Sequence, residues 1–270
     1  VLSGLQSGLQ GVETLSTTGV TATFANQNVG TGITVTTSGA TLVNGTGSNG
    51  GLASNYSLAS GDITRTTTAD INQAVLTATS TAADKSYDAT KDATATLVLS
   101  GLQSGLQGVE TLSTTGVTAT FAHQNVGTGI TVTTSGATLA DGSNGGLASN
   151  YSLGGITTTT ADITQAVLTA TSADDKIYDG NTNATLSLAS FVGDETVTAL
   201  SGATFNSNNV GADTVTLGTM ILADGTGGGL ASNYSLPSGA QFSASITPKA
   251  LIIDGMVAAN KTYDGNVVAA

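Results

Sequence analysis

One short stretch whose residue types could do chemistry occurs three times in the chain. Each copy places a lysine two residues before a Tyr-Asp pair: Lys85, Tyr87 and Asp88; Lys176, Tyr178, Asp179 and Gly180; and Lys261, Tyr263, Asp264 and Gly265. A lysine that is buried with a carboxylate and a carboxamide could form a spontaneous isopeptide bond. The simpler interpretation is an exposed lysine whose stem packs beside the tyrosine. On a strand, Lys and Tyr at this spacing share a face and Asp points the other way.

The tyrosines of this stretch have two interpretations. Their rings could form a ladder on which sugars stack. Alternatively, each ring caps a thin core and its hydroxyl finds a buried partner. Because every repeat supplies the tyrosine, we expect the second interpretation to hold and the tyrosines to be mostly buried.

Oxygen ligands that could hold calcium gather around the second copy of the stretch: Asp174, Asp175, Asp179, Asn181 and Asn183. Their spacing is not that of an EF-hand, because no Glu stands at the twelfth position. Since Asp and Asn also serve turns without a metal, we expect no metal and no other cofactor. The sole histidine, His123, has Asn26 as its counterpart, and no nucleophile-base set recurs, so we expect no enzyme.

The stretch belongs to a longer repeat. Residues 1–42 match residues 98–139 with one difference, and the third copy keeps the landmarks in diverged form. Each Lys-Tyr-Asp stretch follows an apolar run, at 74–79, 166–171 and 250–253. We predict a partial module at 1–72 that lacks its first strands, complete modules at 73–164 and 165–248, and the first strands of a further module at 249–270.

Within each module, short runs alternate apolar and polar residues with a period of two, as at 20–24, 33–36 and 214–217. Such Thr-rich alternation is typical of strands with one buried face. It predicts an all-β fold of small antiparallel β-sandwich-like or grasp-like modules. Because one or two residues join successive modules, we expect a semi-rigid rod. A β-solenoid is the alternative, although no period near 20 residues lies inside the longer repeat.

The composition excludes several classes of partner. The net charge is −12, from 18 acidic and 6 basic residues, which argues against nucleic acid and against a polybasic membrane contact. There is no cysteine, and no apolar run approaches the roughly 18 residues of a membrane span. Surfaces rich in Thr, Ser, Gly and Asn are common in secreted bacterial surface proteins. Since Val1 is not an initiator Met, we expect the chain to be a piece of a longer protein.

These motifs resemble the tyrosine-aspartate-glycine (YDG) repeat domains, and the related mostly-β (MBG) repeats, of very large bacterial surface adhesins, many with a filamentous-haemagglutinin-like secretion domain. The resemblance rests on residues 176–180, 125–129, 149–153 and 161–164, and it covers essentially the whole chain. The second copy departs from the family pattern at Ala89, where the family has Gly. The resemblance implies an extracellular stalk or matrix fibre and no chemistry.

The expected function is therefore a structural segment of a secreted adhesin or filament, at the cell surface or in a biofilm. A module that binds glycan or matrix polysaccharide is the alternative. The expected partners are further copies of the repeat, in the same longer chain or in neighbouring chains joined head to tail. In either case residues 250–270 should project and complete the first module of a neighbour by strand addition.

Overall fold

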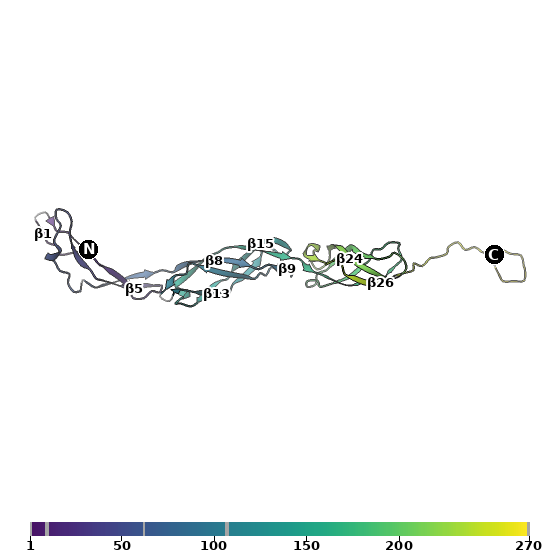
Figure 1. The fold of residues 1–270 in the computed structure, drawn as a ribbon, viewed down its shortest axis with the longest axis horizontal. Helices are drawn as coiled ribbons and strands as arrows, with labels where there is room; N and C mark the ends of the chain where they lie inside the picture. The colour runs from purple at the N-terminus through teal and green to yellow at the C-terminus, as the bar shows by residue number, and fades with distance from the viewer. Residues whose placement is uncertain (1, 9–10, 62, 106–107, 269–270) are drawn as a thin grey trace. The chain divides into compact units, whose positions relative to one another are not determined.

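The computed structural model describes residues 2–8, 11–61, 63–105 and 108–268 of the 270-residue chain. Among these residues there are β-strands and three single-turn 3-10 helices, at Ala53–Asn55, Ala148–Asn150 and Ala231–Asn233, and no α-helix (Figure 1). The strands fall into small sheets of two to four members, most of them antiparallel. The all-β prediction is therefore confirmed, and nothing in this arrangement indicates a solenoid. The described residues contain no helix long and apolar enough to cross a membrane.

The chain divides into two compact units, and each unit draws on three segments. Unit 1 comprises residues 1–81, 95–118 and 134–158, and unit 2 comprises residues 82–94, 119–133 and 159–270. The two units interleave along the sequence instead of following it. This division into units therefore does not test the module boundaries predicted near 72, 164 and 248.

The described residues of unit 1 form six small sheets. One of its long strands, β8 (Ala74–Ala82), buries Leu76, Ala78 and Ser80 on one face, as a period of two requires. The sheets pair β1 (Ser7–Gly8) with β2 (Gly11–Val12); β3 (Leu15–Thr18) with β6 (Thr41–Asn44); β4 (Thr21–Phe24), β5 (Gly30–Ser38) and β7 (Arg65–Ile71) in that order; β10 (Ala95–Ser100), β8 (Ala74–Ala82) and β17 (Tyr151–Ile156) in that order; β11 (Ser104–Gly105) with β12 (Gly108–Val109); and β13 (Leu112–Thr115) with β16 (Thr138–Asp141).

Unit 2 forms four sheets within its described residues. Two have four strands, in the orders β14 (Thr118–Phe121), β15 (Gly127–Ser135), β18 (Thr159–Thr164), β9 (Lys85–Ser86); and β21 (Lys176–Ile177), β26 (Gln241–Thr247), β24 (Gly211–Asp224), β23 (Val197–Phe205). The other two pair β19 (Ala166–Val167) with β25 (Tyr234–Ser235) and β20 (Thr169–Ala173) with β22 (Leu186–Ala189).

Most of the strands expected from the sequence are present. The alternating runs at 20–24, 33–36 and 214–217 coincide with or lie inside β4, β5 and β24. The joints between repeats are as short as expected, with two residues between β7 and β8 and one between β18 and β19.

The first strands expected at 249–270 for a further module stay a prediction, because they were expected to pair only with a neighbouring copy. Residues 250–253 form no strand (Figure 1). The side chains of Leu251 and Ile252 are 88% and 84% exposed. The equivalent run, β8, is held between β10 and β17. Because no such partners flank residues 250–253 among the described residues, their backbone groups have no ladder to join.

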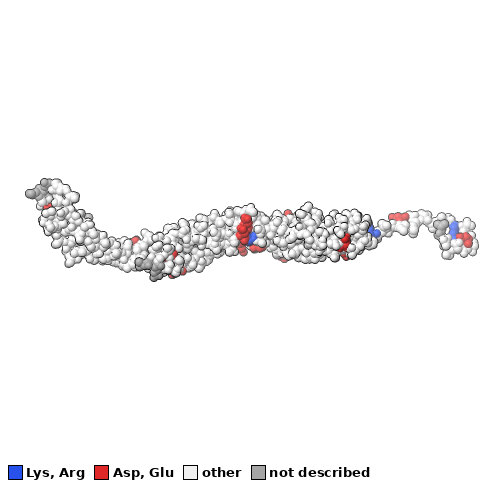
Figure 2. Space-filling view, viewed as in Figure 1, with Lys and Arg blue, Asp and Glu red and all other residues white. Residues whose placement is uncertain are grey.

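The cores are thin, as the scarcity of aromatic residues predicts. The larger core of unit 2 gathers apolar side chains from several strands and loops, and among its buried members are three rings, those of Tyr87, Phe121 and Tyr234. A second core in unit 2 surrounds Phe205. The surface between and over these cores carries few charges, and Figure 2 shows mostly uncharged side chains on the face drawn.

Candidate binding interface around the Lys-Tyr-Asp stretches

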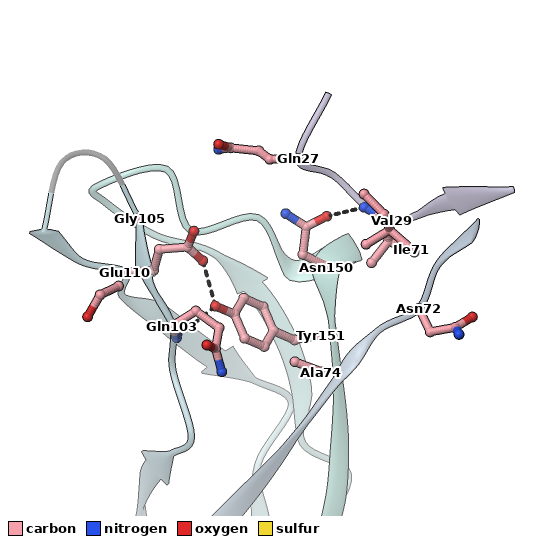
Figure 3. Close-up of a pocket in the computed structure, with 11 residues that line it drawn as sticks. Gln27, Val29, Ile71, Asn72, Ala74, Gln103, Gly105, Glu110, Asn150 and Tyr151 are labelled. Carbon is pink, nitrogen blue, oxygen red and sulfur yellow. Dashed lines mark hydrogen bonds between the residues drawn. The ribbon is translucent and has the colours of Figure 1, made fainter. Parts of the chain in front are cut away.

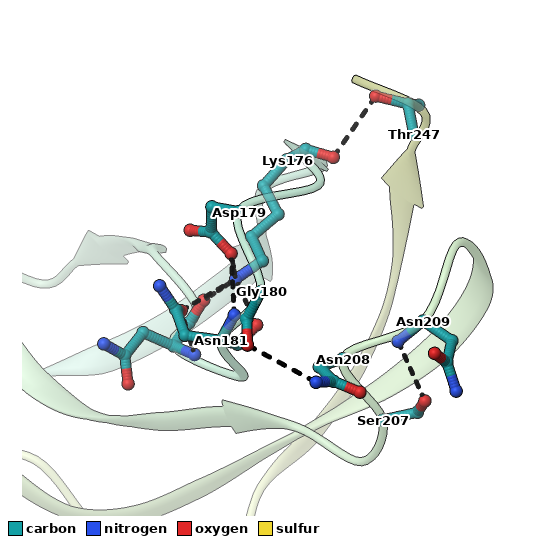
Figure 4. Close-up of polar contacts among 9 residues, drawn as sticks. Lys176, Asp179, Gly180, Asn181, Ser207, Asn208, Asn209 and Thr247 are labelled. Atoms are coloured by element: carbon teal, nitrogen blue, oxygen red, sulfur yellow. Dashed lines mark hydrogen bonds and ion pairs between the residues drawn. The ribbon is translucent and has the colours of Figure 1, made fainter.

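Each Lys-Tyr-Asp stretch folds into a small hook closed by its lysine. The Nζ of Lys176 donates to Oδ1 of Asp179 at 2.8 Å, to Asn181 at the backbone oxygen (2.7 Å) and the side-chain oxygen (3.0 Å), and to the backbone oxygen of Asn183 at 3.0 Å (Figure 4). The same ammonium lies 5.4 Å from the ring centroid of Phe205, which is cation–π distance. The ammonium group of the lysine therefore donates to the oxygen atoms of a turn and also covers an aromatic ring.

The other two stretches form the same hook. Lys85 reaches Asp88 at 2.7 Å and lies 5.4 Å from the centroid of Phe121, and Lys261 reaches Asp264 at 2.9 Å. Hydrogen bonding to Lys176 is the main cause that lowers the pKa of Asp179. The hook thus binds the charged form of its aspartate.

The expectation that Asp points away from Lys is wrong. The residue after each aspartate has a positive φ, at 60° for Ala89, 83° for Gly180 and 74° for Gly265, so the chain turns back instead of continuing as a strand. Because β21 ends at Ile177, a strand no longer holds Asp179 on the opposite face, and the turn after it brings Asn181 and Asn183 back to the lysine. Ala89 makes the same turn as the two glycines, although a left-handed conformation is costly for alanine.

Tyr87 extends from its hook into the core of the following repeat. Its hydroxyl donates to Oε1 of Glu195 at 2.7 Å, while the hydroxyl of Tyr234 donates to Oε2 of the same carboxylate at 2.7 Å. The two rings meet edge to face, with centroids 5.7 Å apart and planes at 78°. Burial, followed by the bond to Glu195, raises the pKa of Tyr87 to about 12. The arrangement is a neutral donor pair around one buried carboxylate.

The glutamate-tyrosine pair recurs in each repeat, and we did not expect it from the sequence. Glu13 accepts from Tyr56 at 2.7 Å and Glu110 accepts from Tyr151 at 2.6 Å, as Glu195 does from Tyr234. A signal was present: the chain has three glutamates, one per repeat, followed after 43, 41 and 39 residues by the tyrosine of an Asn-Tyr-Ser triplet. The six tyrosines thus divide into three that belong to hooks and three that pair with glutamate.

The expectation of buried hook tyrosines holds for one of the three. Tyr87 is 3% exposed, whereas Tyr178 is 40% exposed and Tyr263 is 93% exposed. The reason is that a hook does not bury its own tyrosine. The hydrogen-bond acceptor of Tyr87, Glu195, and the ring that it meets edge to face, Tyr234, both come from the repeat that follows it.

The oxygen-rich residues near the hooks serve turns and strand contacts. Asp175 accepts from the backbone amide of Ser245 at 2.6 Å, and Asn181 accepts from that of Asn183 at 2.9 Å. No group of three or more acidic or histidine side chains among the described residues is placed to hold a metal. The carboxylates paired with the lysines stay about half exposed, at 48–50%, which is unlike the buried trio that an isopeptide bond requires.

A pocket of about 270 Å³ lies beside the glutamate-tyrosine pair of unit 1 (Figure 3). Tyr151 and Glu110 form one wall, while Val29, Ile71 and Ala74 provide apolar lining. Its rim is braced by Asn150, as Figure 3 shows. The Oδ1 of Asn150 accepts from the amide of Val29 at 3.0 Å, and its Nδ2 donates to Asn28 at 3.1 Å.

The same bracing occurs around Tyr87 in unit 2. There Asn233 accepts from the amide of Val126 at 3.0 Å and donates to Asn125 at 3.1 Å. The two sites therefore share their frame, and they differ in that a hook tyrosine fills the one in unit 2.

Comparison with known proteins gives a family. The model of the YDG domain matches three successive segments, residues 1–68, 72–161 and 163–241. No curated protein and no solved structure matches the chain. The matched segments cover most of the sequence and include two of the three hooks and all three glutamate-tyrosine pairs. The chain belongs to the YDG domain family, as a tandem array of this β-rich domain.

Proposed function

We propose that this chain is a structural segment of a stalk or fibre outside the bacterial cell, in a secreted surface adhesin or an extracellular filament. Its role is mechanical and not catalytic, and its immediate partners are further copies of the same repeat. The observation that carries the proposal is the position of Tyr87. Because the ring of one repeat completes the core of the next, neighbouring repeats cannot separate without opening a core.

The direction of the strand pairs supports resistance to pulling. In unit 1, β8 pairs in parallel with β17, from Ala74 opposite Tyr151 to Ala78 opposite Ile156. In unit 2, β9 pairs in parallel with β18. In each pair the earlier strand is reached from the N-terminal side of the chain, and the later strand leads toward the C-terminal side. Tension therefore slides the strands along each other and loads their hydrogen bonds together.

The surface composition supports a location outside the cell. Charged residues make up 9% of the chain, and the hydroxyl and amide side chains of Thr, Ser and Asn cover most of the strands' outer faces. Hydroxyl pairs across strands, such as Thr115 with Thr138 at 2.8 Å, replace the ion pairs that a charged surface would carry. Such a surface depends little on ionic strength, because screening acts on charges.

Single-molecule stretching tests the mechanical role. Because the chain has no cysteine, cysteines introduced at Ser3 and Lys249 give defined handles for end-to-end pulling. Cysteines at Thr169 and Ala189 instead pull open the antiparallel pair of β20 and β22 one rung at a time. We expect a clearly higher rupture force for the end-to-end pair of handles. Equal rupture forces in the two geometries would contradict a mechanical role.

The location is tested separately on cells that produce the parent protein. An antibody against unit 2 should label intact cells or the material around them, and protease added outside should remove the label. Labelling that requires permeabilised cells would contradict the proposed location, whereas the stretching experiment would still test the mechanical role by itself.

A second candidate is a glycan-binding module, and one observation favours it. The rings of Tyr178 and Tyr263 are exposed, as the platforms of sugar-binding sites are. Binding of the chain to bacterial polysaccharides that is lost in Tyr178→Ala would favour this function over the structural one.

A further inference from the structure

One stretch of sequence, Ser-Asn-Gly-Gly-Leu-Ala-Ser-Asn-Tyr-Ser-Leu, occurs twice without change, at residues 48–58 and 143–153. Each copy carries an Asn-Gly pair in the loop after a strand: Asn49 with Gly50 after β6, and Asn144 with Gly145 after β16. Because glycine has no side chain, its backbone nitrogen can approach the preceding asparagine side chain without steric hindrance. The local sequences are identical, so any difference in reactivity between the two asparagines comes from the structure around them.

The peptide group between Asn49 and Gly50 is hydrogen-bonded on both sides. The carbonyl oxygen of Asn49 accepts from the backbone amide of Thr14 at 2.9 Å, and the amide of Gly50 donates to the backbone oxygen of Gly47 at 3.1 Å. Asn49 is half-buried, and its Nδ2 donates to the backbone oxygen of Val12 at 3.4 Å. Rotation of this peptide group therefore breaks two backbone hydrogen bonds.

The peptide group between Asn144 and Gly145 is not held in this way. Within the described residues, no backbone or side-chain group donates to the carbonyl oxygen of Asn144, and the amide of Gly145 has no acceptor. The backbone oxygen of Ser143 accepts from the amide of Thr111 instead, at 3.1 Å. Asn144 and Gly145 are both exposed, and open space lies where a Cβ of Gly145 would be. This peptide group can rotate without breaking a hydrogen bond of the chain.

The remaining Asn-Gly pair of the sequence is also held. The amide of Gly45 donates to the backbone oxygen of Gly51 at 3.0 Å, and Oδ1 of Asn44 accepts from the amide of Ala53 at 2.8 Å. Asp141 stands at the position of Asn44 in the second loop, which is two residues shorter between this position and the next asparagine. In the shorter loop the anchoring carbonyl lies one residue earlier, which leaves the Asn-Gly peptide group unbonded.

We propose that Asn144 is a site of spontaneous deamidation in the folded chain, with water as the only co-reactant. After losing its proton to water or hydroxide, the amide nitrogen of Gly145 attacks Cγ of Asn144. The bond between this nitrogen and Cγ forms, the bond between Cγ and Nδ2 breaks, and Nδ2 takes up a proton and leaves as ammonia. One water molecule then opens the cyclic imide at either carbonyl and gives aspartate or isoaspartate. This inference goes beyond the proposed function and does not depend on it.

The product changes a contact between the loop and β12. Nδ2 of Asn144 donates to the backbone oxygen of Val109, the last residue of β12, at 3.0 Å. A carboxylate has no proton to donate there, so two oxygen atoms face each other instead. The backbone oxygen of Asn144 and the carboxylate of the buried Glu110 both flank Gly105, so the new charge arises close to an existing one. Deamidation should therefore loosen residues 142–146 from β12.

Mass spectrometry of the folded full chain, incubated in mildly alkaline buffer, tests the site. Trypsin cleaves after Arg65, Lys91 and Lys176, which places the two copies in separate peptides, 1–65 and 92–176. Asn144 should convert about ten-fold faster than Asn49, because the reaction at Asn49 must first break two hydrogen bonds. Fragmentation of the first peptide separates Asn49 from Asn44, and a methyltransferase specific for isoaspartate identifies the isomerised product.

Two controls separate structure from local sequence. In denaturant, where both loops are unfolded, Asn49 and Asn144 should convert at equal rates. A Thr-Gly insertion after Gly142 gives the second loop the length of the first, and it should slow conversion of Asn144 in the folded chain toward the rate of Asn49. Equal rates at the two asparagines in the folded chain, or an unchanged rate at Asn144 in the insertion variant, would overturn the proposal.

Hydrogen exchange tests the consequence for the loop. Asn144→Asp should speed exchange of the amides of Thr111 and Gly146, which both donate to Ser143. Asn209→Asp is the matched control, because it adds the same charge at an exposed position far from this loop in the sequence, and exchange in the loop should not change. Exchange as slow in Asn144→Asp as in the parent chain would overturn the loosening of the loop.

Discussion

The hydroxyl of Tyr87 donates to the carboxylate of Glu195 at 2.7 Å across 108 residues of sequence. The tyrosine is part of a hook that closes on its own neighbours, whereas the glutamate belongs to the repeat that follows. A single hydrogen bond thus ties a locally formed motif to a distant core. The consequences of this division between hook and core can be measured residue by residue.

The three hook tyrosines should differ in their contribution to stability. Tyr87→Ala should lower the free energy of unfolding of unit 2 by about 3–5 kcal/mol, the range for removing a buried aromatic ring. Tyr263→Ala, in dilute solution, should change it by less than about 0.5 kcal/mol, because the ring is exposed. Denaturant unfolding followed by circular dichroism checks both variants. Equal effects in the two would mean that the hook alone determines stability.

Alkaline pH should destabilise unit 2 through Tyr87. Its pKa is about 12 in the folded chain against 10.0 ordinarily, because burial and the bond to Glu195 favour the neutral hydroxyl. The stabilisation is fully present below pH 10 and is lost as the pH rises toward 12, since the unfolded chain releases the proton first. Unfolding measured across this window should show the loss, and Tyr87→Phe should make the profile flatter. A Tyr87→Phe profile as steep as that of the parent chain would assign the loss to other groups.

Removing the amine of a hook should cost stability even though the lysine lies at the surface. Lys176→Met keeps the apolar stem but leaves the carbonyls of Asn181 and Asn183 without their donor, and should cost about 1–3 kcal/mol. Lys249→Met is the matched control at an exposed position, and it should be nearly neutral. Thermal unfolding of the two variants provides the comparison. Similar changes in both would show that the hook contacts contribute nothing.

The hook should also make the free energy of unfolding of unit 2 depend on pH in the acid range. Lys176, followed by the backbone amide of Asn181, lowers the pKa of Asp179 below its ordinary 3.8. The corresponding stabilisation is present above pH 3.8 and is lost as the pH falls through the lowered value. Nuclear magnetic resonance titration of the Asp179 carboxyl gives the pKa directly, and Lys176→Met should raise it. An unchanged pKa in that variant would contradict the assigned cause.

The effect of backbone conformation at the hook turn on stability should be separable from the effect of packing. Gly180 has a φ of 83° with open space where a Cβ would lie, so Gly180→Ala should destabilise by about 1 kcal/mol through strain alone. Gly155 also faces open space but has an ordinary φ, and Gly155→Ala should be neutral or slightly stabilising. A neutral Gly180→Ala would mean that the turn adopts another conformation in solution.

The sequence predicted the strands well and the hook contacts poorly. The period of two in β4, β8 and β15 depends only on which residues alternate along one strand, so local patterns suffice. The contacts of Lys176 with Asp179, Asn181 and Asn183 form because β21 ends at Ile177 and the positive φ at Gly180, just after the aspartate, reverses the direction of the chain. A strand template assigns the side chains of Lys176 and Asp179 to opposite faces and therefore misses the hook.

The contact between Tyr87 and Glu195 was missed for a different reason. Glu195 and Tyr87 are far apart in sequence and belong to different repeats. A prediction made for each repeat by itself therefore cannot include their contact. The same limit explains the wrong expectation for Tyr263, since its burial depends on residues outside its own repeat. The sequence does show that glutamates are few and that one recurs in each repeat.

The hook geometry sets an order of events during synthesis of the chain. A hook closes within a few residues, so the Lys85 hook can form as soon as Thr90 leaves the ribosome. Glu195 follows about a hundred residues later, which at ordinary rates of translation is a delay on the order of 10 s. During that interval the ring of Tyr87 stays in water and the core around it is incomplete. The core around Tyr87 therefore finishes folding only when the next repeat is made, and a ribosome pause between the two repeats leaves this aromatic ring exposed to any chaperone nearby.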